Sequence, residues 1–245
     1  MSTSNTNLWK SIGASVIGPS HIIAAKPNQD AWMAFHHMWG DGIVVSDGLG
    51  SKPLSNFGSI AACRAVETAA RHFAATTATG ARTSLFRDIL QKWLDSLGPL
   101  APNDSSATCL FALCLGDGVV RIGLLGDGCA AVVKKDGTVV SLTDSKGDGF
   151  SNQTNALTQS TTDSQWKLLS VAEDECDAAI LCTDGVADDL QNLDGFMLKF
   201  AKQFRGLSKV TGHRQARQVL ESWPVPKHSD DKTIACLFRD ENCDD

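Results

Sequence analysis

The residues in this sequence best suited to chemistry are aspartates followed directly by glycine. The Asp-Gly pair occurs eight times, at Asp41, Asp47, Asp117, Asp127, Asp136, Asp148, Asp184 and Asp194. Asp-Gly taken alone usually forms a turn. Three of the pairs differ because an apolar run leads directly into the aspartate: residues 43–46 precede Asp47, residues 122–126 precede Asp127, and residues 179–183 precede Asp184.

A carboxylate at the end of a buried strand is held on a rigid element. The glycine after it lets the backbone turn sharply and exposes a carbonyl oxygen. Several such carboxylates in one place would repel one another unless a divalent cation neutralised them. Mg²⁺ and Mn²⁺ prefer oxygen ligands. The three strand-end aspartates therefore indicate a site for hard divalent cations.

Two other acidic segments lie beside apolar runs. Asn28-Gln29-Asp30 precedes the run that starts at Trp32, and the segment 229–233 (Ser-Asp-Asp-Lys-Thr) precedes the last apolar run. A cap or a turn explains each of them when it is taken singly. Their order along the chain, with the three Asp-Gly pairs between them, favours a functional interpretation.

The apolar pattern predicts which elements position these residues. Short apolar runs bounded by glycine and aspartate predict strands at 32–38, 42–46, 107–115, 119–125, 130–134, 166–171, 178–182 and 233–238. Apolar residues at helical spacing predict helices at 55–75, 83–97, 196–204 and 214–223. Because strands and helices come in separate groups, the pattern indicates an α+β fold. We also expect a hairpin turn at 135–138 and a polar surface loop at 144–165.

The bulk composition predicts one soluble, cytoplasmic domain over residues 1–245. The hydrophobic fraction is 42%, and a short polar segment and an acidic tail form the ends. The net charge of -6 argues against a nucleic-acid partner. Signal-peptide and membrane-span patterns are both missing. The eight cysteines include no CxxC pair, so we expect buried thiols rather than disulfides or a zinc site.

In their order, the acidic segments resemble the motifs of the metal-dependent protein phosphatases of type 2C, in the bacterial branch of that family. The matching segments are Asn28-Gln29-Asp30-Ala31, Val45-Ser46-Asp47-Gly48-Leu49-Gly50, Gly126-Asp127-Gly128, Thr183-Asp184-Gly185-Val186 and Ser229-Asp230-Asp231-Lys232-Thr233. They extend over nearly the whole chain. The resemblance implies two packed antiparallel β-sheets flanked by helix pairs, with a metal cleft at one end.

The resemblance also implies metal-binding roles. Asp47 would bridge two Mn²⁺ or Mg²⁺ ions, and Gly48 would offer its carbonyl oxygen. Asp184 and Asp230 would complete one ion, while Asp30 would act through metal-bound water. Asp127 matches a carboxylate that helps to hold a third, weaker metal in some relatives.

The activity implied by the resemblance is hydrolysis of phosphoserine or phosphothreonine on proteins. Water or hydroxide bridging two cations about 3.5–4 Å apart would attack phosphorus. Asp30, Asp47 and His21 are the residues we expect to take part in catalysis, and no cysteine nucleophile is needed. The expected partners are a phosphoprotein substrate and a serine/threonine kinase, and the expected state is a monomer.

Two positions depart from the family pattern. Many relatives have an arginine that binds the substrate phosphate where this chain has Ala25, and some have a histidine that acts as general acid where it has Leu49. Lys26 and His21 are our candidates for binding phosphate, and His21 or metal-bound water for donating the proton. These departures leave open a catalytically weak or inactive phosphatase-like module that binds a partner.

Two other classes fit less well. A phosphatase with an aspartyl nucleophile needs Asp-x-Asp, but Val45 and Cys182 stand two residues before Asp47 and Asp184. A nucleotide-binding enzyme needs a glycine-rich phosphate loop, and no GxxxxGK[ST] segment occurs.

Overall fold

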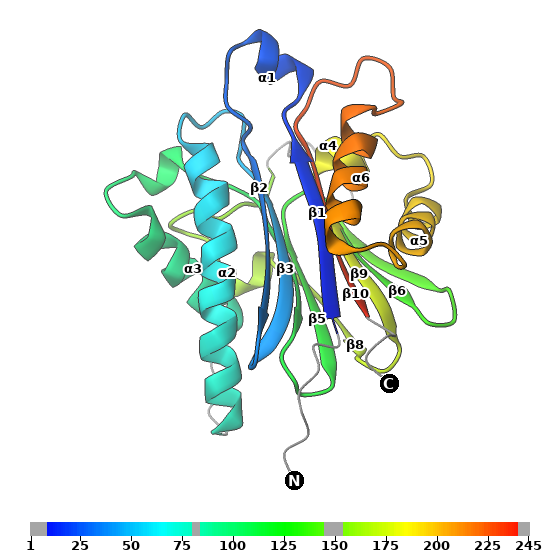
Figure 1. Ribbon diagram of the computed structural model, residues 1–245. Helices are drawn as coiled ribbons and strands as arrows, with labels where there is room; N and C mark the ends of the chain where they lie inside the picture. The colour runs from blue at the N-terminus through cyan, green and yellow to red at the C-terminus, as the bar shows by residue number, and fades with distance from the viewer. Residues whose placement is uncertain (1–8, 80–83, 145–153, 240–245) are drawn as a thin grey trace.

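The computed structural model describes residues 9–79, 84–144 and 154–239, in which ten strands form two five-stranded sheets (Figure 1). One sheet has the order β1-β10-β9-β6-β7, with β1 Trp9–Val16, β10 Lys232–Arg239, β9 Cys176–Cys182, β6 Cys129–Lys134 and β7 Val139–Thr143. The other has the order β2-β3-β4-β5-β8, with β2 Asp30–His37, β3 Gly40–Asp47, β4 Cys109–Cys114, β5 Val119–Leu125 and β8 Lys167–Ala172. All neighbouring strands are antiparallel.

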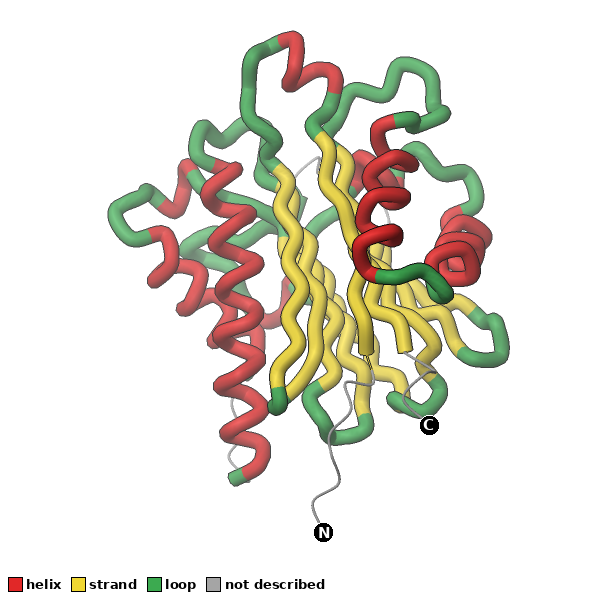
Figure 2. Tube along the Cα trace, viewed as in Figure 1, coloured by secondary structure: helices red, strands yellow, loops and turns green. Residues whose placement is uncertain are grey.

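Helix pairs cover the outer faces of both sheets (Figure 2). Helices α2 (Ser55–Ala78) and α3 (Leu85–Leu97) pack on the β2–β8 sheet. Helices α5 (Leu193–Phe204) and α6 (Lys209–Glu221) pack on the β1–β7 sheet. The shorter helices are α1 (Pro19–Ile23) and α4 (Asp184–Ala187), with 3₁₀ turns at Pro102–Asp104 and Asp163–Gln165. This arrangement confirms the predicted α-β-β-α sandwich.

Strand β3 shows how alternation along one strand builds the layers. Val44 packs against the helix pair α2–α3, whereas Ile43 and Val45 pack between the two sheets. All three are fully buried. Because successive side chains in a strand point to opposite faces, a continuous apolar run is what a strand covered on both sides requires.

Helix α3 shows how the sequence sets a helix boundary. The Ser84 hydroxyl accepts a hydrogen bond from the Arg87 backbone N–H and so caps the first turn. Leu85, Ile89 and Trp93 recur at helical spacing and are buried. The predicted start at residue 83 lies outside the described residues, and the predicted end at Leu97 is confirmed.

Strands β1 and β7 were missed by the pattern of apolar runs. Small or polar residues interrupt β1, and every residue of β7 is partly exposed because β7 is an edge strand. The predicted start of α6 at Arg214 is wrong, since the helix begins at Lys209. Gly212 interrupts the helical pattern there, but a Cβ at this position would lie 2.3 Å from the Ile12 side chain, so glycine lets α6 approach β1.

The described residues also test the predictions for one hairpin turn and for the cysteines. The hairpin turn at 135–138 is confirmed between β6 and β7. Seven cysteines are buried and unpaired, and Cys243 lies outside the described residues. Most of the polar N-terminal segment, the acidic tail and part of the loop 144–165 also lie outside them. None of the described helices is long and apolar enough to span a membrane.

Candidate metal centre and active site

The two sheets bring aspartates to the same end of the sandwich. Asp30 begins β2 and Asp47 ends β3, and these two residues are paired in the antiparallel register. Asp184 follows β9 after one residue and begins α4, while Asp230 comes two residues before β10. Because β9 and β10 are antiparallel neighbours, the end of one lies beside the start of the other.

The pKa values of these carboxyl groups show how closely they are packed. Burial raises the pKa of Asp47 well above its usual range, and the charges of Asp30, Asp184 and Asp230 raise it further. Burial also raises the pKa of Asp30 to about 7. Burial followed by the charges of Asp127 and Asp230 raises the pKa of Asp184 to about 6. The structure thus brings together all five aspartates predicted for the site.

Hydrogen bonds hold several of these carboxylates in place. Thr183 Oγ1 donates to Asp30 Oδ2 over 3.0 Å, and the same hydroxyl accepts from Thr233 N over 3.1 Å. Gly185 N donates to Asp184 Oδ1 over 2.7 Å. Thr183 and Thr233 are fully or almost fully buried. One buried hydroxyl therefore links the end of β9 and the start of β10 to the start of β2.

Gly48 is required where its backbone passes very close to helix α2. A Cβ at Gly48 would lie 2.6 Å from the carbonyl oxygen of Ser55, the first residue of the helix. Gly48 N donates to the Gln29 carbonyl over 3.1 Å. The glycine after Asp47 therefore joins the strand end both to α2 and to the segment that leads into Asp30.

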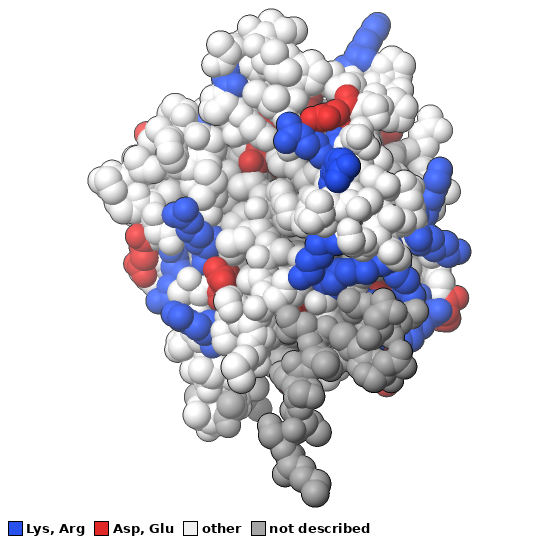
Figure 3. Space-filling model, viewed as in Figure 1, with Lys and Arg blue, Asp and Glu red and all other residues white. Residues whose placement is uncertain are grey.

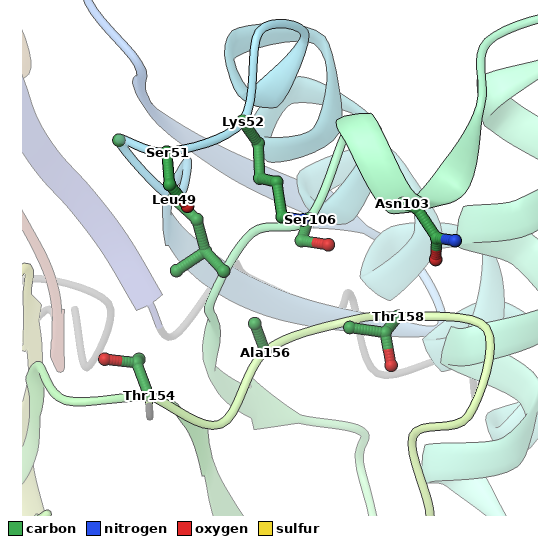
Figure 4. Close-up of a pocket in the computed structure, with 9 residues that line it drawn as sticks. Leu49, Ser51, Lys52, Asn103, Ser106, Thr154, Ala156 and Thr158 are labelled. Carbon is green, nitrogen blue, oxygen red and sulfur yellow. The ribbon is translucent and has the colours of Figure 1, made fainter. Parts of the chain in front are cut away.

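Asp127 is tied to the segment that follows residue 153. Thr154 Oγ1 donates to Asp127 Oδ2 over 2.8 Å. Thr154 also lines a cavity of about 420 Å³ together with Ala156 and Thr158 (Figure 4). The described end of the predicted loop 144–165 therefore borders the aspartate cluster.

His21 lies beside a carboxylate that the sequence reasoning did not single out. Asp231 is only 2% exposed and accepts hydrogen bonds from His21 Nδ1 (2.8 Å), Gly18 N (2.6 Å) and Gln29 N (2.7 Å). His21 is therefore bound to Asp231 rather than directly to the five aspartates. The repeated aspartate in the segment 229–233 was the available signal for this role.

The lysines near the site differ in their surroundings. Lys26 is exposed and lines a cavity of about 300 Å³ with Gln29, Gly50 and Lys52. Lys52 is half-buried and also lines the 420 Å³ cavity, into which its side chain extends (Figure 4). Sequence reasoning missed Lys52 because a single lysine in a loop carries no pattern.

The sequence matches the model of the protein phosphatase 2C family over residues 17–223. The chain belongs to this family. The match confirms the predicted family and the enzyme class, a protein serine/threonine phosphatase. No curated protein sequence matches the chain.

Solved structures share the protein phosphatase 2C fold with this chain. The serine/threonine phosphatase Stp1 from Staphylococcus aureus is 15% identical, with a TM-score of 0.65 over 97% of this chain and 99% of that one. A bacterial serine phosphatase is 16% identical, with a TM-score of 0.63 over 94% and 97%. RsbX in complex with magnesium is 13% identical, with a TM-score of 0.62 over 96% and 97%. At these identities the likeness concerns the fold.

The protein phosphatase 2C family depends on divalent metal ions, and the donors here fit such ions. The five clustered side chains offer only carboxylate oxygens, which Mg²⁺ and Mn²⁺ prefer. Within the described residues, no group of three or more Asp, Glu, His or Cys side chains has the arrangement needed to hold a metal ion by itself. Mg²⁺ typically keeps several waters and uses only one or two carboxylates. A cation that binds between carboxylates also offsets the repulsion that raises their pKa values.

Proposed function

We propose that this chain hydrolyses phosphoserine and phosphothreonine on proteins, with divalent cations held by Asp47, Asp184 and Asp230. The observation that supports this best is the convergence of five aspartates from separate segments, in which Asp47 is influenced by the charges of three others. Carboxylates this close together repel one another, all the more because Asp30 is buried. A site built to bind cations explains why the fold tolerates them.

Each site residue has a proposed role that follows from its position. Two Mn²⁺ or Mg²⁺ ions would lower the pKa of water and offset charge on the phosphoryl oxygens. Because the charges of Asp30, Asp184 and Asp230 all act on Asp47, we take Asp47 as the carboxylate that two ions would share. The Gly48 carbonyl would be a further oxygen ligand, and Asp127 would support a third, weaker site.

Hydrogen-bond donors from the chain orient the carboxylates before any ligand binds. Thr183 fixes Asp30, and Gly185 N fixes Asp184. Groups held in position by their own partners lose less freedom when the transition state forms. Asp30 would act through water, and His21, held by Asp231, remains our candidate for a proton donor or phosphate ligand.

The substrate we propose is a phosphoprotein, and a serine/threonine kinase is the natural regulatory partner. One neighbour of the same fold, 14% identical to this chain, belongs to the bacterial stressosome, described as a modular system adapted to control secondary messenger signalling. We propose by analogy a signalling role in the cytoplasm, carried out by a monomer with one domain over residues 1–245. Lys26 remains a proposed phosphate ligand because it lines the cavity beside Gln29.

A weak or inactive phosphatase-like module is the second candidate. Leu49 replaces the proton donor of some relatives, and the Nδ1 atom of His21 is already bound to Asp231. Such a module would bind a phosphoprotein without turning it over. Activity measured with added Mn²⁺ separates the two proposals.

The test is release of phosphate from a phosphothreonine peptide with Mn²⁺. Wild type should be active, and Asp184→Ala should lose about 10³-fold or more in kcat, since an electrostatic contribution of this kind is commonly that large. Asp194→Ala is the matched control, because Asp194 also precedes glycine but is exposed in the first turn of α5. Equal rates for wild type and Asp184→Ala would contradict the proposal.

A further inference from the structure

A phosphate ester that approaches five aspartates needs positive charge that the protein has not already neutralised. The cavities at this end of the sandwich differ sharply in their charged lining. One of about 200 Å³ contains Lys227 and Lys232, but it is lined by four aspartates: Asp184, Asp188, Asp189 and Asp230. Lys232 Nζ is 3.4 Å from Asp189 Oδ2. Without bound cations, this cavity would repel a dianion.

The 300 Å³ cavity lined by Lys26 and Lys52 has the opposite character. It is lined by Lys26, Pro27, Gln29, Gly50, Ser51, Lys52 and Pro53, with two lysines and no carboxylate. Gln29 directly precedes Asp30, and Gly50 comes three residues after Asp47. The cavity is therefore positive, and its lining comes from the segments that lead into Asp30 and follow Asp47.

Lys52 is the better positioned of its two lysines. Its backbone is fixed because Lys52 N donates to the Leu49 carbonyl over 2.8 Å and its own carbonyl accepts from Ser55 N over 3.4 Å. Its side chain is half-buried, whereas that of Lys26 is exposed. Within the described part of the chain, the Lys52 ammonium forms no salt bridge. Arg217, which lines another cavity of about 660 Å³, pairs with Glu221 instead.

Gln29 supplies a second observation that points to a ligand. Its side chain is only 6% exposed, and Nε2 donates to Ser55 Oγ over 2.7 Å. Among the described residues, its Oε1 atom has no hydrogen-bond partner, and it lies 3.8 Å from where a Cβ on Gly50 would be. A 180° rotation of the amide would let Oε1 accept from the Ser55 hydroxyl and free Nε2 to donate. In that rotated state the buried amide would offer a free N–H donor, which suits an anion.

We propose that Lys52, assisted by Lys26 and Gln29, binds the phosphate group of the substrate monoester. This inference rests on the proposed phosphatase function and names its phosphate-binding residue. Charge-assisted hydrogen bonds from an ammonium to phosphate oxygens are among the strongest in proteins. A lysine on the loop after Asp47 thus supplies the cation that the chain lacks at Ala25.

The experiment compares Lys52→Gln with wild type, using as the matched control Lys92→Gln in α3, where the lysine is also half-buried. With the Mn²⁺-loaded enzyme, Lys52→Gln should raise KM for p-nitrophenyl phosphate and Ki for inorganic phosphate by about 10- to 30-fold, as expected for loss of one charge-assisted bond. The value of kcat should change less than KM. Lys52→Arg should restore both constants to within about threefold, because it keeps the charge.

Calorimetric titration of the Mn²⁺-loaded protein with inorganic phosphate keeps this test independent of turnover. If wild type binds phosphate but does not hydrolyse esters, the proposed function fails, whereas weaker binding by Lys52→Gln still supports the assignment of Lys52. Phosphate affinity of Lys52→Gln within about twofold of wild type would overturn the assignment. A KM that rises for a phosphopeptide but not for the small ester would also overturn it, because Lys52 would then bind the peptide.

Discussion

At the scale of single residues, Asp47 shows why the metal-free protein is strained. Asp47 is half-buried near Asp30, Asp184 and Asp230, and both burial and these charges raise the pKa of its carboxyl group. Each pKa unit corresponds to ~1.4 kcal/mol of unfavourable interaction with the charged form. In a binding site of this kind, crowded charges lower the stability of the protein without its ligand and raise its affinity for the ligand.

Asp47→Asn should therefore separate stability from activity. The substitution removes a half-buried carboxyl that neighbouring charges oppose, so without metal at pH 7.5 we expect the free energy of unfolding to rise by ~1–2 kcal/mol. Mn²⁺ should stabilise wild type much more than the variant, because only wild type keeps the bridging carboxylate. Urea unfolding with EDTA and with Mn²⁺ measures both effects. A variant less stable than wild type in EDTA would contradict the charge-repulsion argument.

The pH dependence of stability follows from Asp30 and Asp184. Their pKa values in the folded chain are raised from 3.8 to about 7 and about 6. The folded chain therefore retains protons that the unfolded chain releases. The stability that these two protonated carboxyl groups contribute is fully present below pH 3.8 and is lost as the pH rises through 6 to 7. In EDTA, the melting temperature should fall between pH 5 and pH 7.5.

Two comparisons test whether these carboxyl groups cause the fall in melting temperature. Saturating Mn²⁺ should reduce it, because cations favour the deprotonated carboxylates. Asp30→Asn should also reduce it, because the variant cannot titrate at this position. A melting temperature that is flat or rises over this pH range in EDTA would show that the carboxyl groups are not packed as described.

At the scale of elements, a chain of polar groups joins the two sheets near their open edges. Ser11 of β1 shares a hydrogen bond of 2.9 Å with His36 Nε2 of β2, and His36 Nδ1 shares one of 2.6 Å with Asp41 Oδ1 of β3. Ser-His-Asp is also the order of a hydrolytic triad. Ser11 is only 4% exposed, however, so its hydroxyl is closed to a substrate and the chain of bonds is structural.

Ser11→Ala should lower the free energy of unfolding by about 1–2 kcal/mol, because it leaves a largely buried histidine nitrogen without its partner. Ser222→Ala is a suitable control. Its hydroxyl donates to the Gln218 carbonyl over 2.6 Å on the exposed end of α6, and we expect a change within about 0.5 kcal/mol. Chemical denaturation of both variants measures this. Equal values for Ser11→Ala and wild type would argue that the bond between the sheets contributes nothing.

The elements differ in how well their residues predict them. The strands that end at Asp47 and before Asp184 are continuous apolar runs, so both the strands and their terminal carboxylates are readable from the sequence. In β1, Ser11 and Gly13 conceal the strand, because their fit depends on groups from other elements: His36 for the serine and the Trp32 ring for the glycine. Contacts between distant segments leave no periodic signal.

At the scale of the whole molecule, the order of the acidic motifs predicts the fold and the aspartate cluster together. The roles of Lys52 and Asp231 were not predictable in this way, because they depend on cavities and on backbone N–H groups from distant loops. The surface is not uniformly acidic despite the net charge of -6. Figure 3 shows Lys and Arg side chains spread over the face that carries α2 and α6.

The segment 144–165 should influence which protein substrates are accepted. Its described part lines the 420 Å³ cavity through Thr154, Ala156 and Thr158 and contacts Asp127 through Thr154. Replacing the segment with that of a relative should change kcat/KM for phosphoproteins about 10-fold or more, a shift of ~1.4 kcal/mol. Activity on p-nitrophenyl phosphate should change much less. Equal losses on both substrates would assign the segment to the chemistry itself.

We propose that aspartates distant in sequence share divalent cations. Calorimetric titration of the metal-free protein with Mn²⁺ tests this proposal most directly. We predict that wild type binds about two Mn²⁺ ions per chain, as expected for a two-metal site, and that Asp47→Asn loses the tighter binding. The exposed control Asp194→Ala should match wild type. Mn²⁺ binding that is undetectable in wild type, or unchanged in Asp47→Asn, would contradict the account.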